Sequence, residues 1–211
     1  MKDIILSLSG GLDSSSLLFE YKDRIKLAVS FAYGSNHEKQ ELASAELVAK
    51  KANVEHKIIN ISNVFQGINS ALLAGSEQVP QDCYNTDTIR NLVVPFRNGI
   101  FLSILAAIAE SEKLEYIALA SHAGDHAVYP DCTEAFSDAM NEAIKLGTTN
   151  NVKFFRPYIN LTKREVAIRG IKAGLNPDWT YSCYKGGKIP CSKCPTCIER
   201  NEALKGLKWP Q

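Results

Sequence analysis

The chain has few of the features that mark membrane, secreted or nucleic-acid-binding proteins. Its longest apolar stretch, residues 100–109, is too short for a membrane span, which takes about 20 residues. The 24 basic and 23 acidic residues nearly cancel, so the charge of +1 provides no basic footprint for a long nucleic acid. No secretory signal pattern precedes the first apolar segment. We therefore expect a cytoplasmic protein with no membrane contact.

Internal repeats and low-complexity tracts are also absent, and apolar strand patterns alternate with helical patterns almost to the end of the chain. The sequence predicts strands at residues 3–8, 25–33, 54–61, 114–121 and 152–155. It predicts helices at residues 12–21, 38–52, 98–109, 132–146 and 161–173. This order favours an α/β fold with a doubly wound, mostly parallel sheet. We expect residues 1–175 to form this domain and residues 176–211 to form a small zinc-binding region, with a cysteine knuckle and helical structure, packed on it.

Three predicted loops follow strands of this sheet. The first contains the glycines after strand one, the second begins at Gly34 after strand two, and the third covers residues 122–131 after strand four. Ligands of open α/β sheets bind beyond the carboxyl ends of the strands. We therefore expect these three loops to build one site.

The first loop reads SLSGGLDSS and spans residues 7–15. At a strand-to-helix turn, free backbone N–H groups and the helix dipole form an anion site, although the glycines can also simply make a turn that Asp or Ser caps. The chain lacks both the G-x-x-x-x-G-K-[ST] pattern and the third glycine of the dinucleotide fingerprint. The full string resembles the pyrophosphate loop of the ATP pyrophosphatases, which split ATP between its α and β phosphates. This resemblance implies that ATP binds at Leu8, Ser9, Gly10, Gly11, Leu12, Asp13, Ser14 and Ser15, with Asp13 near Mg²⁺.

Four of the six cysteines crowd the C-terminal end of the chain. They are Cys183, Cys191, Cys194 and Cys197, whereas Cys83 and Cys132 stand alone. Four closely spaced thiolates suit one tetrahedral Zn²⁺ in a closed, structural site. An iron–sulfur cluster or four reduced thiols without metal are the alternatives.

Two further segments acquire meaning from their order along the chain. Alone, Arg97-Asn98 reads as the start of a helix with Asn98 as its cap, and Asp131 reads as a turn cap. Together with the glycine-rich loop and the cysteines, they resemble the 7-cyano-7-deazaguanine synthase family. The matching pieces are SGGLDSS, Tyr33-Gly34 with His37, Arg97-Asn98, Tyr129-Pro130-Asp131-Cys132, Thr162-Lys163 and Ser182-Cys183-Tyr184-Lys185-Gly186-Gly187, which runs into the cysteine knuckle.

The resemblance implies an ATP-dependent ligase that converts 7-carboxy-7-deazaguanine and ammonia to 7-cyano-7-deazaguanine. Adenylation of the acid, attack by ammonia and a second adenylation of the resulting amide would give the nitrile and consume two ATP. The implied cofactors are Mg²⁺ with ATP and one structural Zn²⁺. A homodimer that uses free ammonia is also implied, and neither Cys83 nor Cys132 is expected to act as a covalent nucleophile.

The substrate residues follow from the matching segments. Asp131 is expected to accept the paired donors of the deazaguanine edge, with Asp125 as second choice and Asn98 nearby. Arg97 is expected beside the developing charge of the adenylate, and Lys163 beside a phosphate.

The sequence departs from the family pattern near this expected pocket. The family usually has Gly where Phe96 stands, Gln or a similar residue at Ser35, Asn at His122, and Arg-Pro-Glu where Thr133-Glu134-Ala135 stands. Two alternatives therefore stay open. One is a related adenylating enzyme that transfers a deazapurine or other acid to a protein or tRNA acceptor. The other is a zinc-knuckle RNA-binding protein, whose basic residues would be Lys185, Lys188, Lys193 and Arg200.

Overall fold

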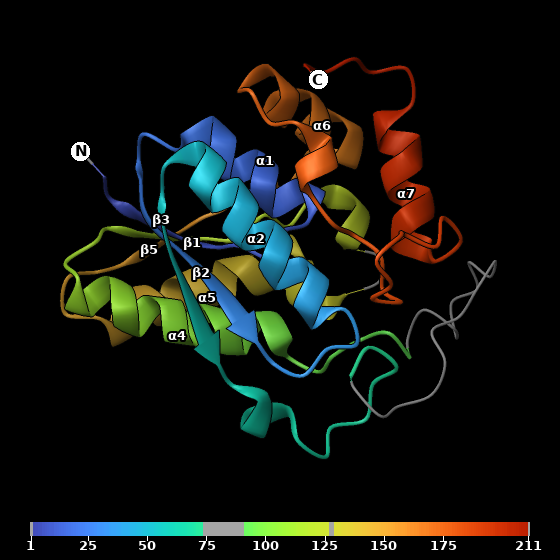
Figure 1. Cartoon of the computed structure of the whole chain (residues 1–211). Helices are drawn as coiled ribbons and strands as arrows, with labels where there is room; N and C mark the ends of the chain where they lie inside the picture. Colours follow the sequence, from blue (N-terminus) through green and yellow to red (C-terminus); the bar gives the residue numbers. More distant parts are fainter. Residues whose placement is uncertain (1, 74–90, 127–128, 211) are drawn as a thin grey trace.

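A five-stranded, fully parallel sheet forms the centre of the molecule (Figure 1). The computed structural model describes residues 2–73, 91–126 and 129–210. The strands are β1 (Ile4–Ser7), β2 (Ile25–Ala32), β3 (Glu55–Asn60), β4 (Tyr116–Ala118) and β5 (Lys153–Phe155), in the order β3-β2-β1-β4-β5. The order reverses between β1 and β4, so the loops after these two strands diverge and leave a crevice.

Central strands are apolar because both faces of the sheet are covered. All four residues of β1 are buried, whereas β3, at the sheet edge, has mostly exposed side chains. In register, Ser7 pairs with Val29 of β2, and Leu6 pairs with Ala118 of β4. This alignment places the ends of β1, β2 and β4 at the same edge of the sheet.

Helices cover the two faces and create two separate cores (Figure 1). On one face lie α1 (Leu12–Tyr21), α2 (Glu38–Ala52) and α6 (Lys163–Lys172), whereas α4 (Arg97–Ser111) and α5 (Glu134–Gly147) cover the other. Close packing of α1 on α6 requires Gly170, because a Cβ there would lie 2.3 Å from the Ser16 Oγ. The α/β fold class with a doubly wound parallel sheet is thus confirmed.

Several element boundaries differ from the sequence predictions. The helix expected from residue 132 begins at Glu134, because the Thr133 hydroxyl accepts the N–H of Phe136 and caps it. The strand expected over residues 114–121 is limited to β4. The helical part of the C-terminal region, for which the sequence predicted no bounds, is α7 (Pro195–Leu204). Residues 74–90, which include Cys83, lie outside the described residues.

The C-terminal segment folds back onto the glycine-rich loop, where the N–H of Tyr181 donates to the Gly10 carbonyl at 3.0 Å. Helix α7 packs against α6. A separate C-terminal region over residues 176–211 stays a prediction. Among the described helices, none combines the length and the apolar character that crossing a membrane requires.

Candidate active site

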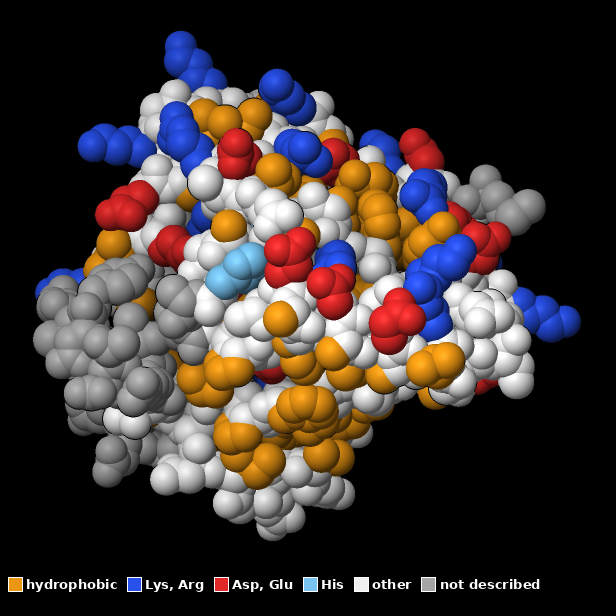
Figure 2. Space-filling model, turned by 180° about the vertical axis from the view of Figure 1, so that it is seen from behind, with side chains coloured by type: hydrophobic (Ala, Val, Ile, Leu, Met, Phe, Trp, Pro, Cys, Tyr) orange, Lys and Arg blue, Asp and Glu red, His pale blue; other side chains and the backbone are white. Residues whose placement is uncertain are grey.

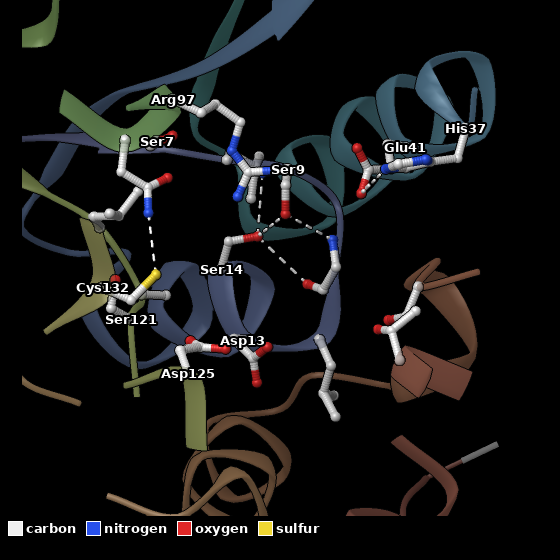
Figure 3. A pocket seen from close by; sticks show the side chains of 18 of the residues that line it. Ser7, Ser9, Asp13, Ser14, His37, Glu41, Arg97, Ser121, Asp125 and Cys132 are labelled. Atoms are coloured by element: carbon white, nitrogen blue, oxygen red, sulfur yellow. Dashed lines mark hydrogen bonds and ion pairs between the residues drawn. The ribbon is translucent and has the colours of Figure 1, made fainter. Parts of the chain in front are cut away.

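A cavity of about 270 Å³ opens at the switch point of the sheet. The loops after β1, β2 and β4 all contribute to its lining, as the sequence predicted, and so does the C-terminal segment. Figure 3 shows how side chains from these distant segments point toward one another. Four groups of residues line it: the glycine-rich loop, a charged network around Asp13, the surroundings of Arg97, and the start of α2.

The glycine-rich loop ends in an open helix N-terminus. Gly11 is the N-cap of α1 and no side chain caps this helix, so its first N–H groups can bind an anion. The Ser9 and Ser14 hydroxyls lie 3.0 Å apart, and Ser9 Oγ accepts the Gly11 N–H at 3.2 Å. The predicted ATP residues that line the cavity are Leu8, Ser9, Gly11, Leu12, Asp13 and Ser14, whereas Gly10 and Ser15 are not among the lining residues.

Gly10 has a different task from Gly11. Its φ of +80° is a left-handed conformation, and a Cβ there would lie 2.4 Å from the Glu41 carbonyl oxygen and 2.6 Å from the Ala45 nitrogen. The first glycine therefore lets α2 approach the loop. Gly11 has a φ of −72°, and the nearest atom to a Cβ there would be Ser9 Oγ at 3.2 Å.

A charged network lies below this loop. Lys163 Nζ contacts Asp13 Oδ2 at 2.9 Å, Glu199 Oε2 at 3.1 Å and His122 Nε2 at 3.4 Å. Burial alone would raise the pKa of Asp13, but the charges of Lys163 and His122 outweigh it and lower that pKa. Burial raises the pKa of Asp125, which accepts the N–H of His122 at 3.2 Å. Asp13 Oδ1 is buried without a hydrogen-bond partner, and such an oxygen suits a hard divalent cation.

Arg97 places a positive charge at the cavity, on the side away from Asp13 (Figure 3). Its Nη1 donates to the Tyr33 hydroxyl at 3.4 Å, and its guanidinium carbon lies 5.8 Å from the centre of that ring. The Nε atom is buried without a hydrogen-bond partner. Within the described residues, no carboxylate lies within 4.0 Å of this guanidinium. A cation in this state suits an anionic ligand.

Asp131 and Asn98 are hydrogen-bonded to each other. The Asp131 carboxylate accepts the backbone N–H of Asn98 at 2.9 Å, so it stabilises the first turn of α4. Asp131 does not line the cavity, whereas Asn98 and Asp125 do. Asn98 is not the helix cap, which is Phe96; its side-chain amide lies 3.2 Å from Cys132 Sγ. Asp131 therefore caps α4 and not its own turn, as the alternative interpretation had it, and its contact with a purine stays a prediction.

Two residues at the start of α2 were not assigned to the site from the sequence as ligands or catalysts. His37 is 2% exposed, and its Nε2 lies 3.5 Å from Glu41 Oε1. Burial lowers the pKa of His37 to about 4 and raises the pKa of Glu41 to about 8. Their spacing of four residues, with His37 in a family-matching segment, is the signal that could have identified the pair. Glu199 and Tyr181 also line the cavity and no local pattern marks them, whereas Tyr184 lies in a family-matching segment but was given no role from the sequence.

The four C-terminal cysteines form one cluster. The sulfur atoms of Cys183, Cys191, Cys194 and Cys197 all lie within 4.8 Å of one another. The N–H groups of Cys191 and Cys194 point at Cys183 Sγ and Cys191 Sγ, both at 3.3 Å. This donor set fits a tetrahedral metal ion. Cys194 is also the N-cap of α7, so the cluster sets the position of the helix that brings Glu199 to the cavity.

Comparisons with known proteins agree with this geometry. Over most of its length the chain resembles 7-cyano-7-deazaguanine synthases: 45% identity over 203 residues with that of Porphyromonas gingivalis (96% of this chain, 92% of the relative), and 40% over 207 residues with that of Desulfotalea psychrophila (97% and 94%). The structure of NMN synthetase from Francisella tularensis shares the fold, with a TM-score of 0.54 at 16% identity, covering 89% of this chain and 68% of that one. The family model described as "Queuosine biosynthesis protein QueC" matches residues 3–208, so the chain belongs to the QueC family.

Proposed function

We propose that the protein is an ATP-dependent 7-cyano-7-deazaguanine synthase, which converts 7-carboxy-7-deazaguanine and ammonia to the nitrile. The observation that carries this proposal is the pairing, in one cavity, of an uncapped helix N-terminus with an Arg97 cation that has no carboxylate partner among the described residues. The first suits the phosphates of ATP, and the second suits the carboxylate that ATP would activate. Membership of the QueC family supports the same assignment.

The phosphate side would be formed by the glycine-rich loop and the charged network. The open N–H groups of α1, with Ser9 and Ser14, would hold the β and γ phosphates, and Lys163 would neutralise a phosphate oxygen. Mg²⁺ would be held at Asp13, whose buried Oδ1 has no partner. The ion would supply charge neutralisation of the triphosphate.

The acid would be held on the side of Arg97. A carboxylate is a poor electrophile, and transfer of AMP to it provides a leaving group that ammonia can displace. Arg97 would stabilise the negative charge of the reacting carboxylate and of the adenylate. For the purine edge we favour Asp125 over Asp131, because Asp125 lines the cavity while Asp131 caps α4.

The cysteine cluster would hold one Zn²⁺ in a structural role. Its four protein ligands leave no open coordination position, so the ion would supply rigidity and no chemistry. We further propose a cytoplasmic protein that takes ammonia from solution.

A homodimer is part of the proposal. Figure 2 shows apolar side chains gathered on the lower half of the back face, the level at which α4 and α5 lie in Figure 1. Phe96 is 57% exposed just before α4, and Leu146 is 87% exposed near the end of α5. Light scattering of the purified protein tests this part: a mass of one chain at micromolar concentration would contradict it.

The test of the main proposal supplies the purified protein with ATP, Mg²⁺, ammonia and 7-carboxy-7-deazaguanine. We expect pyrophosphate release that depends on the acid, and a nitrile detected by mass spectrometry. A product in which the deazapurine is attached to a protein or a tRNA would instead identify a related adenylating enzyme. Release of no pyrophosphate, with salt-sensitive RNA binding, would contradict the assignment as an ATP-dependent ligase.

Two carboxylate variants then locate the purine. Asp125→Asn should weaken binding of both the acid and the amide intermediate about tenfold or more, because both would use the same paired acceptor. Asp131→Asn should mainly lower stability, because it weakens a helix cap. Equal binding of the acid by Asp125→Asn and the parent, with loss in Asp131→Asn, would return the purine site to Asp131.

A further inference from the structure

The proposed reaction leaves a proton-transfer problem that the phosphate and carboxylate sites do not solve. Ammonia enters with three N–H bonds, and the nitrile nitrogen has none. In the first half, the nitrogen lone pair forms the C–N bond, the C–O bond to AMP breaks and one N–H proton leaves. In the second half, the adenylated amide loses its two remaining N–H protons as the second C–O bond to AMP breaks. A proton acceptor must therefore lie beside the reacting carbon.

Most ionisable side chains among the described residues of the cavity lining already form ion pairs or hydrogen bonds. Asp13 and Glu199 both pair with Lys163, and Glu38 accepts the Gly34 N–H at 2.6 Å. Asp125 accepts the backbone N–H of His122 and lies 3.7 Å from its Nε2. The remaining acidic groups of the lining hold their protons too tightly: burial raises the pKa of Cys132 to about 12 and raises the pKa values of Tyr33, Tyr129 and Tyr184.

Glu41 differs from all of these groups. In the part of the chain that the structure describes, His37 is the one basic group within 4.0 Å of its carboxylate. His37 is itself buried, and its Nδ1 has no partner. Glu41 therefore lines the cavity as a carboxyl group without a neutralising lysine or arginine. Figure 3 shows the pair together on α2, away from Asp13 and Asp125.

The position of Glu41 beside the reacting groups is set by the backbone. The Glu41 carbonyl is the atom that Gly10 must approach, so this turn of α2 is packed directly on the glycine-rich loop. Glu41 and Arg97 line the same cavity. Burial raises the pKa of Glu41, and the charge of Arg97, which acts in the opposite direction, does not cancel this effect. Glu41 is thus near the proposed sites of both the phosphates and the carboxylate.

We propose that Glu41 is the general base that accepts the N–H protons of the nitrogen substrate during amide and nitrile formation. This inference rests on the proposed synthase function. In each transfer the ionised carboxylate takes one proton from nitrogen and then releases it to solvent. A base whose pKa lies near the working pH can do both, and burial brings the pKa of Glu41 to about 8.

The experiment separates adenylation from amination. Acid-dependent exchange of pyrophosphate into ATP, measured without ammonia, reports adenylation; amide and nitrile, measured by mass spectrometry with ammonia, report the later steps. Glu41→Gln should keep exchange within about threefold of the parent and lower amide formation by about 100-fold or more, the usual effect of losing a general base. Glu41→Asp should recover part of this loss. Glu46→Gln, an exposed glutamate of the same helix, is the control and should match the parent.

The pH profile of the parent enzyme provides a second readout, which does not depend on the folding of any variant. At a constant concentration of free ammonia, amide formation by the parent should rise with pH through an inflection near 8, and Glu41→Gln should lack that inflection. Amide formation by Glu41→Gln at the parental rate, loss of exchange in this variant with an intact fold, or a flat profile in the parent would each overturn the proposal. Absence of acid-dependent exchange in the parent would instead refute the proposed function itself.

Discussion

Two segments at opposite ends of the chain line the same cavity, and they are built in different ways. The loop at residues 7–15 is formed by neighbours in sequence: the end of a buried strand, two glycines and the start of an uncapped helix. The segment from Tyr181 to Glu199 has little regular structure before α7, and its shape depends on four sulfur atoms gathered within 4.8 Å. Lys163 joins the two, because it contacts both Asp13 and Glu199. The C-terminal cysteine cluster therefore positions a residue of the cavity, Glu199, in addition to fixing the end of the chain.

The largest effect should come from breaking the cysteine cluster. Cys194→Ser removes a fully buried thiol of that cluster at the N-cap position of α7, so the proposed Zn²⁺ should be lost and Glu199 should lose its position. We expect a loss of about 3–5 kcal/mol, a fall in Tm of roughly 10 °C, and loss of acid-dependent pyrophosphate release. Elemental analysis, a thermal melt and the release assay measure these. Lys188→Ala, an exposed residue of the same segment, should leave all three unchanged; a Cys194→Ser protein with full activity would show that the two regions are independent.

The two glycines of the N-terminal loop should respond differently. Gly10→Ala places a Cβ 2.4 Å from the Glu41 carbonyl oxygen in a left-handed conformation, and should cost about 2–4 kcal/mol. Gly11→Val meets no backbone atom as closely, so the fold should survive while backbone approach to phosphate is blocked and ATP turnover is lost. Thermal melts and pyrophosphate release distinguish the two. Equal stability of both variants would contradict the packing role of Gly10, and unimpaired turnover by Gly11→Val would contradict the phosphate site.

A smaller effect should follow from weakening the contact between Lys163 and Glu199, which joins the two regions. Glu199→Gln removes one carboxylate from Lys163 and leaves the cysteine cluster intact. We expect pyrophosphate release to fall about tenfold, equivalent to about 1.4 kcal/mol, with Tm within about 2 °C of the parent. Glu202→Gln, exposed on the same helix, is the matched control. Parental activity in Glu199→Gln would mean that α7 only covers the cavity.

The smallest effect should be a pH-dependent change in thermal stability caused by Glu41 on α2. The folded-state pKa of Glu41 is about 8, above its ordinary value of 4.5, so the folded protein binds the extra proton and loses stability as pH rises from about 4.5 to 8. His37, lowered from 6.5 to about 4, contributes the opposite slope, and only between pH 4 and 6.5. Glu41→Gln should therefore raise Tm relative to the parent at pH 8, by about 2–4 °C, with the difference shrinking toward pH 5. An equal difference at both pH values would contradict the raised pKa.

Departures from the family pattern have physical consequences in the structure. Phe96 adopts a left-handed conformation with φ of +52°, which explains why glycine, the usual residue of the family here, is favoured at this position. Its ring stands edge-on to Phe136 with 5.8 Å between centroids. His122, in the place of the usual asparagine, is part of the charged network around Lys163. Neither Phe96 nor His122 lines the cavity, but each is adjacent in sequence to a residue that does, Arg97 and Ser121.

Local sequence patterns were sufficient to predict the order of the strands along the chain, the α/β class, the glycine-rich loop and the cluster of four cysteines. Each of these is a local signal: buried strands are continuous apolar runs, helices repeat with a period of 3.6, and the loop and the thiols are short motifs. The family resemblance extended these signals to Arg97, Asn98 and Asp131, which local reading alone would have taken for ordinary helix and turn residues.

Which of these residues lie on the same surface depends on the three-dimensional packing of the chain, and the sequence patterns did not predict it. Asp131 turned out to cap α4, because its carboxylate reaches the Asn98 N–H 33 residues away, while Asp125 faces the cavity. The raised pKa of Glu41 arises from burial, which outweighs the opposing charge of Arg97 on α4. Helix α7 and the position of Glu199 depend on the gathered cysteines. Burial and charge pairing are sums over neighbours distant in sequence, and no short segment contains them.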